Sequence, residues 1–178
     1  MLDPVAATVE ELALGEFFNR LLISAARMKL DLRAVASLDE ALALAPRLDE
    51  HSAEFMAQFS DEPFPRGASE RFLRRHFAAR ETCLVLAERT GKTWGVCLVG
   101  PFTDPLLGTT QPMLLVLHVD PSLRHRGVAS ELVRDAERIL AERGCKTLAA
   151  RAGHNDDALI SMGERWGFVR SWELMVKE

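Results

Sequence analysis

The stretch of this sequence with the clearest chemical potential is "LHVDPSLRHRGVASELV", residues 117–133. An apolar, strand-like run ends at a proline, and Arg124, His125 and Arg126 then stand directly before Gly127 and an amphipathic run. The start of a helix exposes amide protons without intrahelical partners and carries about half a positive charge, so it attracts anions. Glycine lets a ligand approach the backbone closely, and guanidinium groups add charged donors. The pattern therefore predicts a phosphate or diphosphate site at a strand–loop–helix junction.

The basic cluster does not match two other phosphate-binding loops. The sequence contains no GxxxxGK[ST] pattern, which excludes a P-loop, and no GxGxxG pattern after a first strand, which leaves a dinucleotide fold unsupported. What remains is R-x-x-G-x-A in "RHRGVA". So short a pattern fits an exposed, arginine-rich helix start equally well, and on these letters alone both interpretations stay open.

A wider region, residues 114–168, resembles the GNAT superfamily of N-acetyltransferases in two motifs. "LHVDPSLRHRGVASELV" is similar to the family's V-x-P-x-x-(Q/R)-x-x-G-x-(G/A) acetyl-CoA loop. "ERGCKTLAARAGHNDDALISMGERWGF" resembles the strand that follows and the helix that ends in a Gly-Phe pair. The resemblance implies an acetyl-CoA-dependent N-acetyltransferase that acetylates a primary amine of a small molecule or peptide by direct attack in a ternary complex.

The resemblance also implies which residues bind the coenzyme. The backbone of His118 and Val119 would pair with the pantetheine arm, and Asn155 would contact the same arm. The diphosphate would be held by the loop and the first turn of the helix, namely Arg124, His125, Arg126, Gly127, Val128, Ala129 and Ser130.

The sequence departs from the family at the positions that complete the reaction. The family tyrosine that protonates the departing thiolate falls on Gly163, and the chain contains no tyrosine. Met113 and Leu115 occupy positions where family members often place a basic Glu or His. His118 is the candidate base, although a histidine on a buried strand can equally be a hydrogen-bonded core residue. A non-catalytic acyl-CoA-binding domain that acts as a sensor or scaffold is therefore the alternative.

Strand and helix patterns alternate along the chain. Together with the resemblance they predict an α/β (α+β) fold, a mixed and mostly antiparallel sheet flanked by helices, with a helical extension at 1–28 before a domain at 29–178. Helices are expected at 8–28, from 40 to 58 with Asp39 as cap, from Ser69, at 128–143 and at 156–166. Strands are expected at 29–37, in a hairpin around Gly91, at 113–119 after a loop over 101–112, at 146–152 and at 169–177.

Composition and spacing exclude several function classes. The net charge of −4 argues against a general nucleic-acid binder. No apolar run reaches the roughly 18 residues of a membrane span, so a soluble, cytoplasmic protein is expected. Three cysteines without a CxxC spacing and five histidines without an HExxH pattern predict neither a disulfide framework nor a metal site.

The acceptor side is less well defined by the sequence. In the GNAT arrangement, residues 51–76 and 101–112 would shape specificity. Arg71, Arg74 and Arg75 can recognise an anionic acceptor or simply form a solvated helix face. The apolar face of the helix at 8–28 needs cover, either from its own domain or from a second subunit in a homodimer.

Overall fold

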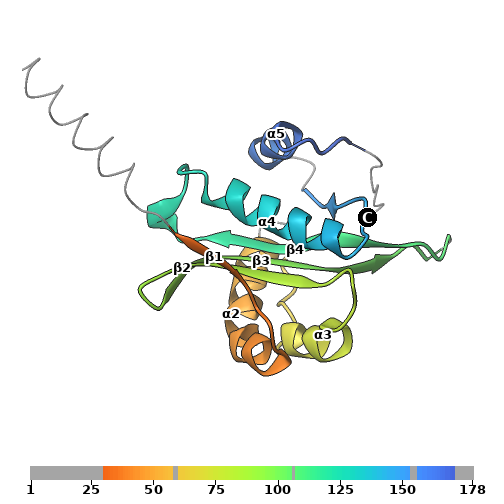
Figure 1. The fold of residues 1–178 in the computed structure, drawn as a ribbon, viewed down its shortest axis with the longest axis horizontal. Coiled ribbons are helices and arrows are strands. Elements are labelled where there is room, and N and C mark those ends of the chain that lie inside the picture. The colour runs from red at the N-terminus through yellow and green to blue at the C-terminus, as the bar shows by residue number, and fades with distance from the viewer. Residues whose placement is uncertain (1–29, 58–59, 106, 153–155, 171–178) are drawn as a thin grey trace, which may run out of the picture. The chain divides into compact units, whose positions relative to one another are not determined.

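The part of the chain that can be described comprises residues 30–57, 60–105, 107–152 and 156–170 of a computed structural model (Figure 1). Internal contacts divide the chain into two units, Met1–Asp31 and Leu32–Glu178. The helix expected at 8–28 lies outside the described residues. The division into an extension at 1–28 and a domain at 29–178 therefore stays a prediction.

A five-stranded sheet in the order β1-β2-β3-β4-β5 forms the centre of the fold. Its strands are β1 (Asp31–Ala34), β2 (Cys83–Arg89), β3 (Lys92–Thr103), β4 (Thr110–Val119) and β5 (Ala149–Ala150). β2, β3 and β4 pair antiparallel, whereas β4 and β5 pair parallel. The expected mixed and mostly antiparallel sheet is confirmed.

Helices cover both faces of the sheet (Figure 1). α2 (Leu38–Met56) and α3 (Ala68–His76) lie on one face, and α4 (Val128–Glu142) lies on the other. α2 and α3 bury a core cluster against alternate strand residues, which include Leu84 and Leu86 of β2, Val96 and Leu98 of β3, and Val116 of β4. Because side chains alternate along a strand, His118 shares the α2 face with Val116.

The first two described helices begin slightly earlier than expected. α2 starts at Leu38, and its cap is Ser37, whose hydroxyl accepts from the Glu40 amide at 3.2 Å, so Asp39 is the wrong cap. Ser37 is the cap because it has an extended backbone and directly precedes the helix, whereas Asp39 already lies inside the helix. α3 starts at Ala68, one residue before the expected Ser69.

The two hairpins show one confirmed prediction and one error. β2 and β3 join through Thr90 and Gly91, both with positive φ, as a two-residue hairpin turn requires. The loop expected over 101–112 is shorter than predicted and spans 104–109, because β3 extends to Thr103, β4 begins at Thr110, and Pro101 pairs with Pro112. Neither proline has an amide proton to donate, so the two must face each other at a non-hydrogen-bonded position of the antiparallel pair. At such a position the β3–β4 pairing loses no hydrogen bond.

The second half of the chain follows the prediction at its helices and departs from it at its strands. α4 ends before Gly144, which has a φ of +79°, and α5 (Asp157–Arg165) is capped by Asp156. The strand expected at 146–152 is limited to the two residues of β5. Of the closing strand expected at 169–177, Val169 and Arg170 are not in a strand and the remainder lies outside the described residues.

Candidate functional site

The junction between β4 and α4 presents an uncapped helix start. Gly127 is the residue before α4, has a φ of +83°, and no side chain in the described part of the chain caps the first turn. A Cβ added to Gly127 would meet no atom within 4 Å. The first turn of α4 therefore has amides without a side-chain cap next to a glycine with open space around its Cα, which is a local geometry that suits an anion.

The loop before α4 is held by short-range hydrogen bonds. The Asp120 amide donates to the Trp94 carbonyl at 2.8 Å, and the Asp120 carboxylate accepts from the Ser122 amide at 3.0 Å and its hydroxyl at 2.5 Å. These bonds lower the pKa of Asp120. Leu123 is buried, and Arg124 Nε donates to the Val119 carbonyl at 3.2 Å. The loop is thus anchored to the sheet on both sides of its 3₁₀ turn.

Among the residues that the structure describes, no strand pairs with the second half of β4 on the side of β5, so this edge is open. β5 pairs only with Met113 and Leu114, and the register shift opposite Leu98 and Val99 leaves Leu115 as a bulge. The Asp120 amide donates to β3, and along a strand the backbone hydrogen-bonding groups of successive residues point to opposite sides. The backbone groups of His118 therefore also point to β3, whereas those of Leu117 and Val119 point to the open edge. Leu117, which the sequence did not single out, is therefore placed where a ligand could pair with the strand.

The residues expected to hold a diphosphate lie together around this junction. Arg124, His125, Arg126 and Gly127 are exposed, Ala129 and Ser130 are half-buried, and the side chain of Val128 is buried, which leaves its amide as the group to consider. Asn155 lies outside the described residues.

α5 is tied to the start of α4 by one hydrogen bond. The indole Nε1 of Trp166, at the C-cap of α5, donates to the Ser130 hydroxyl at 2.8 Å. Gly163, inside α5, has space around it, because an added Cβ would lie 3.8 Å from its nearest neighbour, the Cβ of Phe168. Close packing therefore does not explain why this position lacks a side chain.

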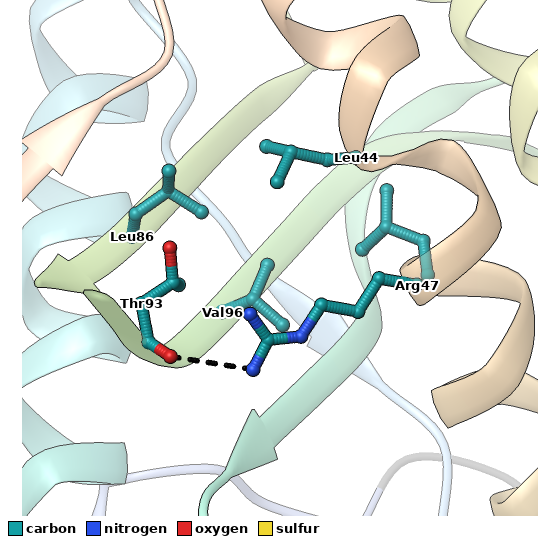
Figure 2. Close-up of a pocket in the computed structure, with 6 residues that line it drawn as sticks. Leu44, Arg47, Leu86, Thr93 and Val96 are labelled. Carbon is teal, nitrogen blue, oxygen red and sulfur yellow. Dashed lines mark hydrogen bonds between the residues drawn. The ribbon is translucent and has the colours of Figure 1, made fainter. Parts of the chain in front are cut away.

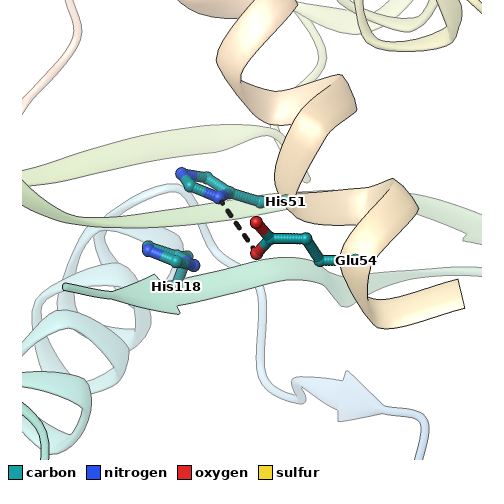
Figure 3. A group of neighbouring side chains, drawn as sticks. All are labelled: His51, Glu54 and His118. Carbon is teal, nitrogen blue, oxygen red and sulfur yellow. Dashed lines mark ion pairs between the residues drawn. The ribbon is translucent and has the colours of Figure 1, made fainter. Parts of the chain in front are cut away.

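A cluster of three side chains lies at the end of β4, on the α2 face (Figure 3). The imidazoles of His118 and His51, the latter on α2, stack with ring centroids 3.5 Å apart and an interplanar angle of 11°. The Glu54 carboxylate lies 3.9 Å from Nδ1 of His51. The sequence placed His51 and Glu54 within the range 51–76 expected to shape specificity, but it did not single them out as partners of His118. Their i,i+3 spacing was visible, but nothing local indicated that β4 would place His118 beside them.

Burial keeps both imidazoles neutral at pH 7. It is the main cause that lowers the pKa of His51 to about 4, with His118 and Arg47 acting in the same direction. Burial also lowers the pKa of His118, where the Glu54 carboxylate is the leading opposing influence and Arg124 reinforces the decrease. Both ring nitrogens of His51 are buried, and neither one has a hydrogen-bond partner among the described residues. A neutral imidazole at His118 retains a lone pair that can accept a proton.

The same three residues offer ligand atoms within 4.8 Å of one another, a spacing that raises the question of a metal. The lone pair of an imidazole nitrogen lies in the plane of its ring. Because the two rings are nearly parallel, their lone pairs run side by side and do not converge on one point as a tetrahedral site requires. As arranged here, the cluster fits proton exchange better than metal binding.

A cavity of about 160 Å³ opens beside the histidine cluster. Its walls are α2 from His51 to Phe55, β4 from Leu115 to His118, and Arg124 of the loop. It therefore connects the histidine cluster with the loop that leads to the uncapped helix start. A small substrate in this cavity would meet both.

A second cavity lies between α2 and the β2–β3 hairpin (Figure 2). Its volume is about 10 Å³, and its lining includes Leu44, Leu86 and Val96. Nη2 of Arg47 donates to the Thr93 carbonyl at 3.3 Å. A space of this size holds about one water molecule, so it is no substrate site.

No helix in the described part of the chain has the length and apolarity needed to cross a bilayer.

Known proteins resemble this chain in sequence. The family profile described as "Acetyltransferase (GNAT) family" matches residues 46–168. Two Mus musculus proteins, N-acetyltransferase family 8 member 3 and member 7, are each 28% identical over 102 residues. Each match covers 56% of this chain and 44% of the relative, so the chain spans less than half the length of these curated relatives.

Solved structures share the fold at low sequence identity. The aminoglycoside acetyltransferase AAC(6')-Iy, in complex with the bisubstrate analogue CoA-S-monomethyl-acetylneamine, is 19% identical with a TM-score of 0.61, and the match covers 84% of this chain and 97% of that one. A ribosomal-protein-alanine N-acetyltransferase from Brucella melitensis is 18% identical with a TM-score of 0.54, over 83% and 99% of the two chains. At these identities the likeness is one of fold.

Proposed function

We propose that this chain, which belongs to the acetyltransferase (GNAT) family, transfers an acetyl group from acetyl-coenzyme A to an amine of a small molecule or peptide. The observation that carries the proposal is the uncapped start of α4, flanked by arginines and adjoining the open edge of β4. Aminoglycosides and a ribosomal protein are named for structural relatives, and they suggest amines as the acceptor class.

The residues around the start of α4 fit the coenzyme. The amides from Gly127 to Ser130 would bind the diphosphate, with Arg124 and Arg126 supplying charged donors. Gly127 leaves the approach free, since a Cβ there would point into open space. The open-edge backbone of Leu117 and Val119 would pair with the pantetheine arm. Acetyl-coenzyme A, when bound, supplies an acetyl group activated as a thioester.

His118 is the group that would accept the proton of the attacking amine. An amine with a pKa near 10.4 is neutral only about 0.04% of the time at pH 7, a handicap of roughly 4.6 kcal/mol. As the amine nitrogen bonds to carbon it becomes cationic and far more acidic, so a neutral imidazole can then take its proton. Burial keeps His118 neutral at pH 7, and its side chain lines the cavity beside the loop.

The departing thiolate has no tyrosine to protonate it. A thiol with a pKa near 8.5 is a tolerable leaving group at neutral pH, and a positioned acid contributes about 10²- to 10⁴-fold. The space around Gly163 allows water to approach, which supports release by solvent protonation. Turnover without the acid is therefore expected to be slow but measurable.

Thiol release tests the proposal. The protein is incubated with acetyl-coenzyme A and a panel of amines that includes aminoglycosides and peptide N-termini, and free thiol is followed with a chromogenic reagent. Release that depends on the acceptor, together with an acetylated product of the matching mass, supports the transferase. A rate that no amine in the panel raises above the acceptor-free background counts against it.

A second candidate function is favoured by the missing tyrosine alone. A domain that binds acyl-coenzyme A as a sensor or scaffold needs the anion site but no acid at position 163. Calorimetry separates the two functions, because the sensor binds acetyl-coenzyme A without any acceptor-dependent thiol release. Acetylation of an acceptor would eliminate it.

A further inference from the structure

We propose that His51 and Glu54 of α2 are positioning residues for His118: the His51 ring holds the His118 imidazole by stacking, and the Glu54 carboxylate stabilises the imidazolium formed when His118 takes the amine proton. This inference rests on the proposed function. It assigns to α2 a role in the proton transfer, in addition to its packing against the sheet.

The stacking geometry supports the role of His51. The two rings lie 3.5 Å apart and 11° from parallel, so each restricts rotation of the other about its χ2 angle. The side chain of His51 is only 10% exposed, and its neighbour one turn earlier in the helix, Leu48, is buried in the core. A rigid helix therefore presents a fixed flat surface to the His118 ring, which stands at the end of β4.

The position of Glu54 supports its electrostatic role. Its carboxylate oxygen and a nitrogen of each imidazole lie within 4.8 Å of one another, so the carboxylate stands beside both rings. The charged groups that act on His118 are Glu54 and Arg47 from α2, and Arg124 and Asp120 from the loop after β4. The two arginines disfavour a proton on His118, and Glu54 is the strongest of the influences that favour it. When the proton moves to His118, the covalent N–H bond of the cationic amine nitrogen breaks and a covalent N–H bond to an imidazole nitrogen forms, so the positive charge passes to His118.

The first test measures the titration of His118 without any reaction. The histidine Cε1–H resonances of the wild type, Glu54→Gln and Glu50→Gln are followed by NMR against pH, and His118→Gln identifies the resonance. Glu50 is an exposed acid on the same helix, outside the cavity, so its variant removes the same charge. Because the Glu54 charge raises the pKa of His118, we expect that pKa to fall in Glu54→Gln and to stay constant in Glu50→Gln. An unchanged pKa in Glu54→Gln overturns it.

The second test separates positioning from acceptor binding. Because the Glu54 side chain is 70% exposed and solvent weakens its effect, Glu54→Gln is expected to lose a few-fold in kcat, with little change in KM for the amine. The acid limb of its pH profile is expected at lower pH than in the wild type. A variant that raises only the KM for the amine, with an unmoved acid limb, would mean that Glu54 binds the acceptor instead and would overturn the inference.

The third test concerns the stacked ring. His51→Phe keeps a flat surface for His118, whereas His51→Ala removes it, and circular dichroism establishes that both variants are folded. We expect His51→Phe to retain most of the wild-type kcat and His51→Ala to lose it. Equal activity in the two variants overturns the role of stacking. If the wild type transfers no acetyl group while the NMR shift occurs, the proposed function fails and the catalytic role of the pair fails with it.

Discussion

At the scale of single residues, His118 is the side chain that we propose as the base. It lines the cavity, stacks on His51 and lies close to the loop that leads to α4. A histidine at the end of a strand is often a satisfied core residue, but this one is half-buried and faces a cavity. Its surroundings therefore favour a role in proton transfer over a role in packing.

The pH dependence of kcat follows from the lowered pKa of His118. The base must be neutral, so activity is full above its folded-state pKa and is lost as the pH falls through that value. Because burial places this pKa below 6.5, the acid limb of kcat is expected below pH 6.5. His118→Gln is expected to lose about 10²- to 10⁴-fold in kcat and to lack this limb. An identical acid limb in His118→Gln would assign the titration to another group.

Gly127 tests where the coenzyme diphosphate binds. In Gly127→Glu the new side chain would point into open space at the start of α4, and its charge would repel phosphate. We expect the affinity for coenzyme A, measured by calorimetry, to fall at least about tenfold. Gly108→Glu is a matched control, because Gly108 also has a positive φ and open space around it but lies in the β3–β4 loop. Unchanged affinity in Gly127→Glu would refute this location.

At the scale of elements, α5 supports the first turn of α4 through one hydrogen bond. The Trp166 indole donates to the Ser130 hydroxyl, so it occupies a lone pair of that oxygen and leaves the hydroxyl proton available to an anion. Trp166 therefore acts on the proposed diphosphate site through Ser130.

Replacing the indole tests this connection. Trp166→Phe keeps an aromatic ring but removes the donor, and it is expected to weaken coenzyme A binding by a few-fold, the effect of one hydrogen bond worth about 0.5–1.5 kcal/mol. Ser130→Ala is expected to show a similar loss, and the double variant no more than the larger of the two. Calorimetric dissociation constants for all four proteins complete the cycle. Additive losses would show that the two residues act separately.

The contact between β3 and α3 depends on Gly100. A Cβ there would lie 2.1 Å from Cζ of Phe72 and 2.9 Å from Cδ1 of Leu115. Gly100→Ala is therefore expected to lower the free energy of unfolding by about 1–3 kcal/mol through overpacking. In contrast, Gly163→Ala has room and removes a glycine from a helix interior, so it is expected to raise that free energy by up to about 1 kcal/mol. Urea denaturation of both variants measures the difference, and equal effects would contradict it.

At the scale of the whole molecule, the histidine cluster links stability to pH. The pKa of His51 is about 4 in the folded state and near 6.5 in the unfolded chain, so between these values the unfolded state binds the additional proton. The contribution of the neutral, buried His51 to the free energy of unfolding is therefore fully present above pH 6.5 and decreases as the pH falls towards 4. Burial of both imidazoles makes the fold itself sensitive to acid.

Acid titration of stability tests this linkage. The wild type is expected to lose on the order of 3 kcal/mol of unfolding free energy through His51 between pH 6.5 and pH 4. His51→Phe carries no titratable group, so its stability is expected to depend less on pH over this window. Urea denaturation at several pH values measures both. Parallel curves for the two proteins would place the acid sensitivity elsewhere.

The proposed anion site at the start of α4 could be derived from the sequence because its parts are local. The strand, the basic loop, Gly127 and the first turn of α4 follow one another within residues 117–133, so their order alone determines which groups meet. Local signals also located α4 and the β2–β3 hairpin. They failed at 101–103 and 110–112, where the prolines predicted a loop but the residues pair as parts of β3 and β4.

Only the tertiary structure decided what surrounds His118. His51 and Glu54 come from a helix far earlier in the chain, and they reach His118 because α2 packs on the face of the sheet that carries Val116. The bulge at Leu115 and the two-residue length of β5 likewise depend on how strands pair, which opens the edge of β4 at Leu117 and Val119. The sequence by itself determined the uncapped helix start at Gly127, because neighbouring residues build it, whereas the histidine cluster exists only because folding brings separate elements together.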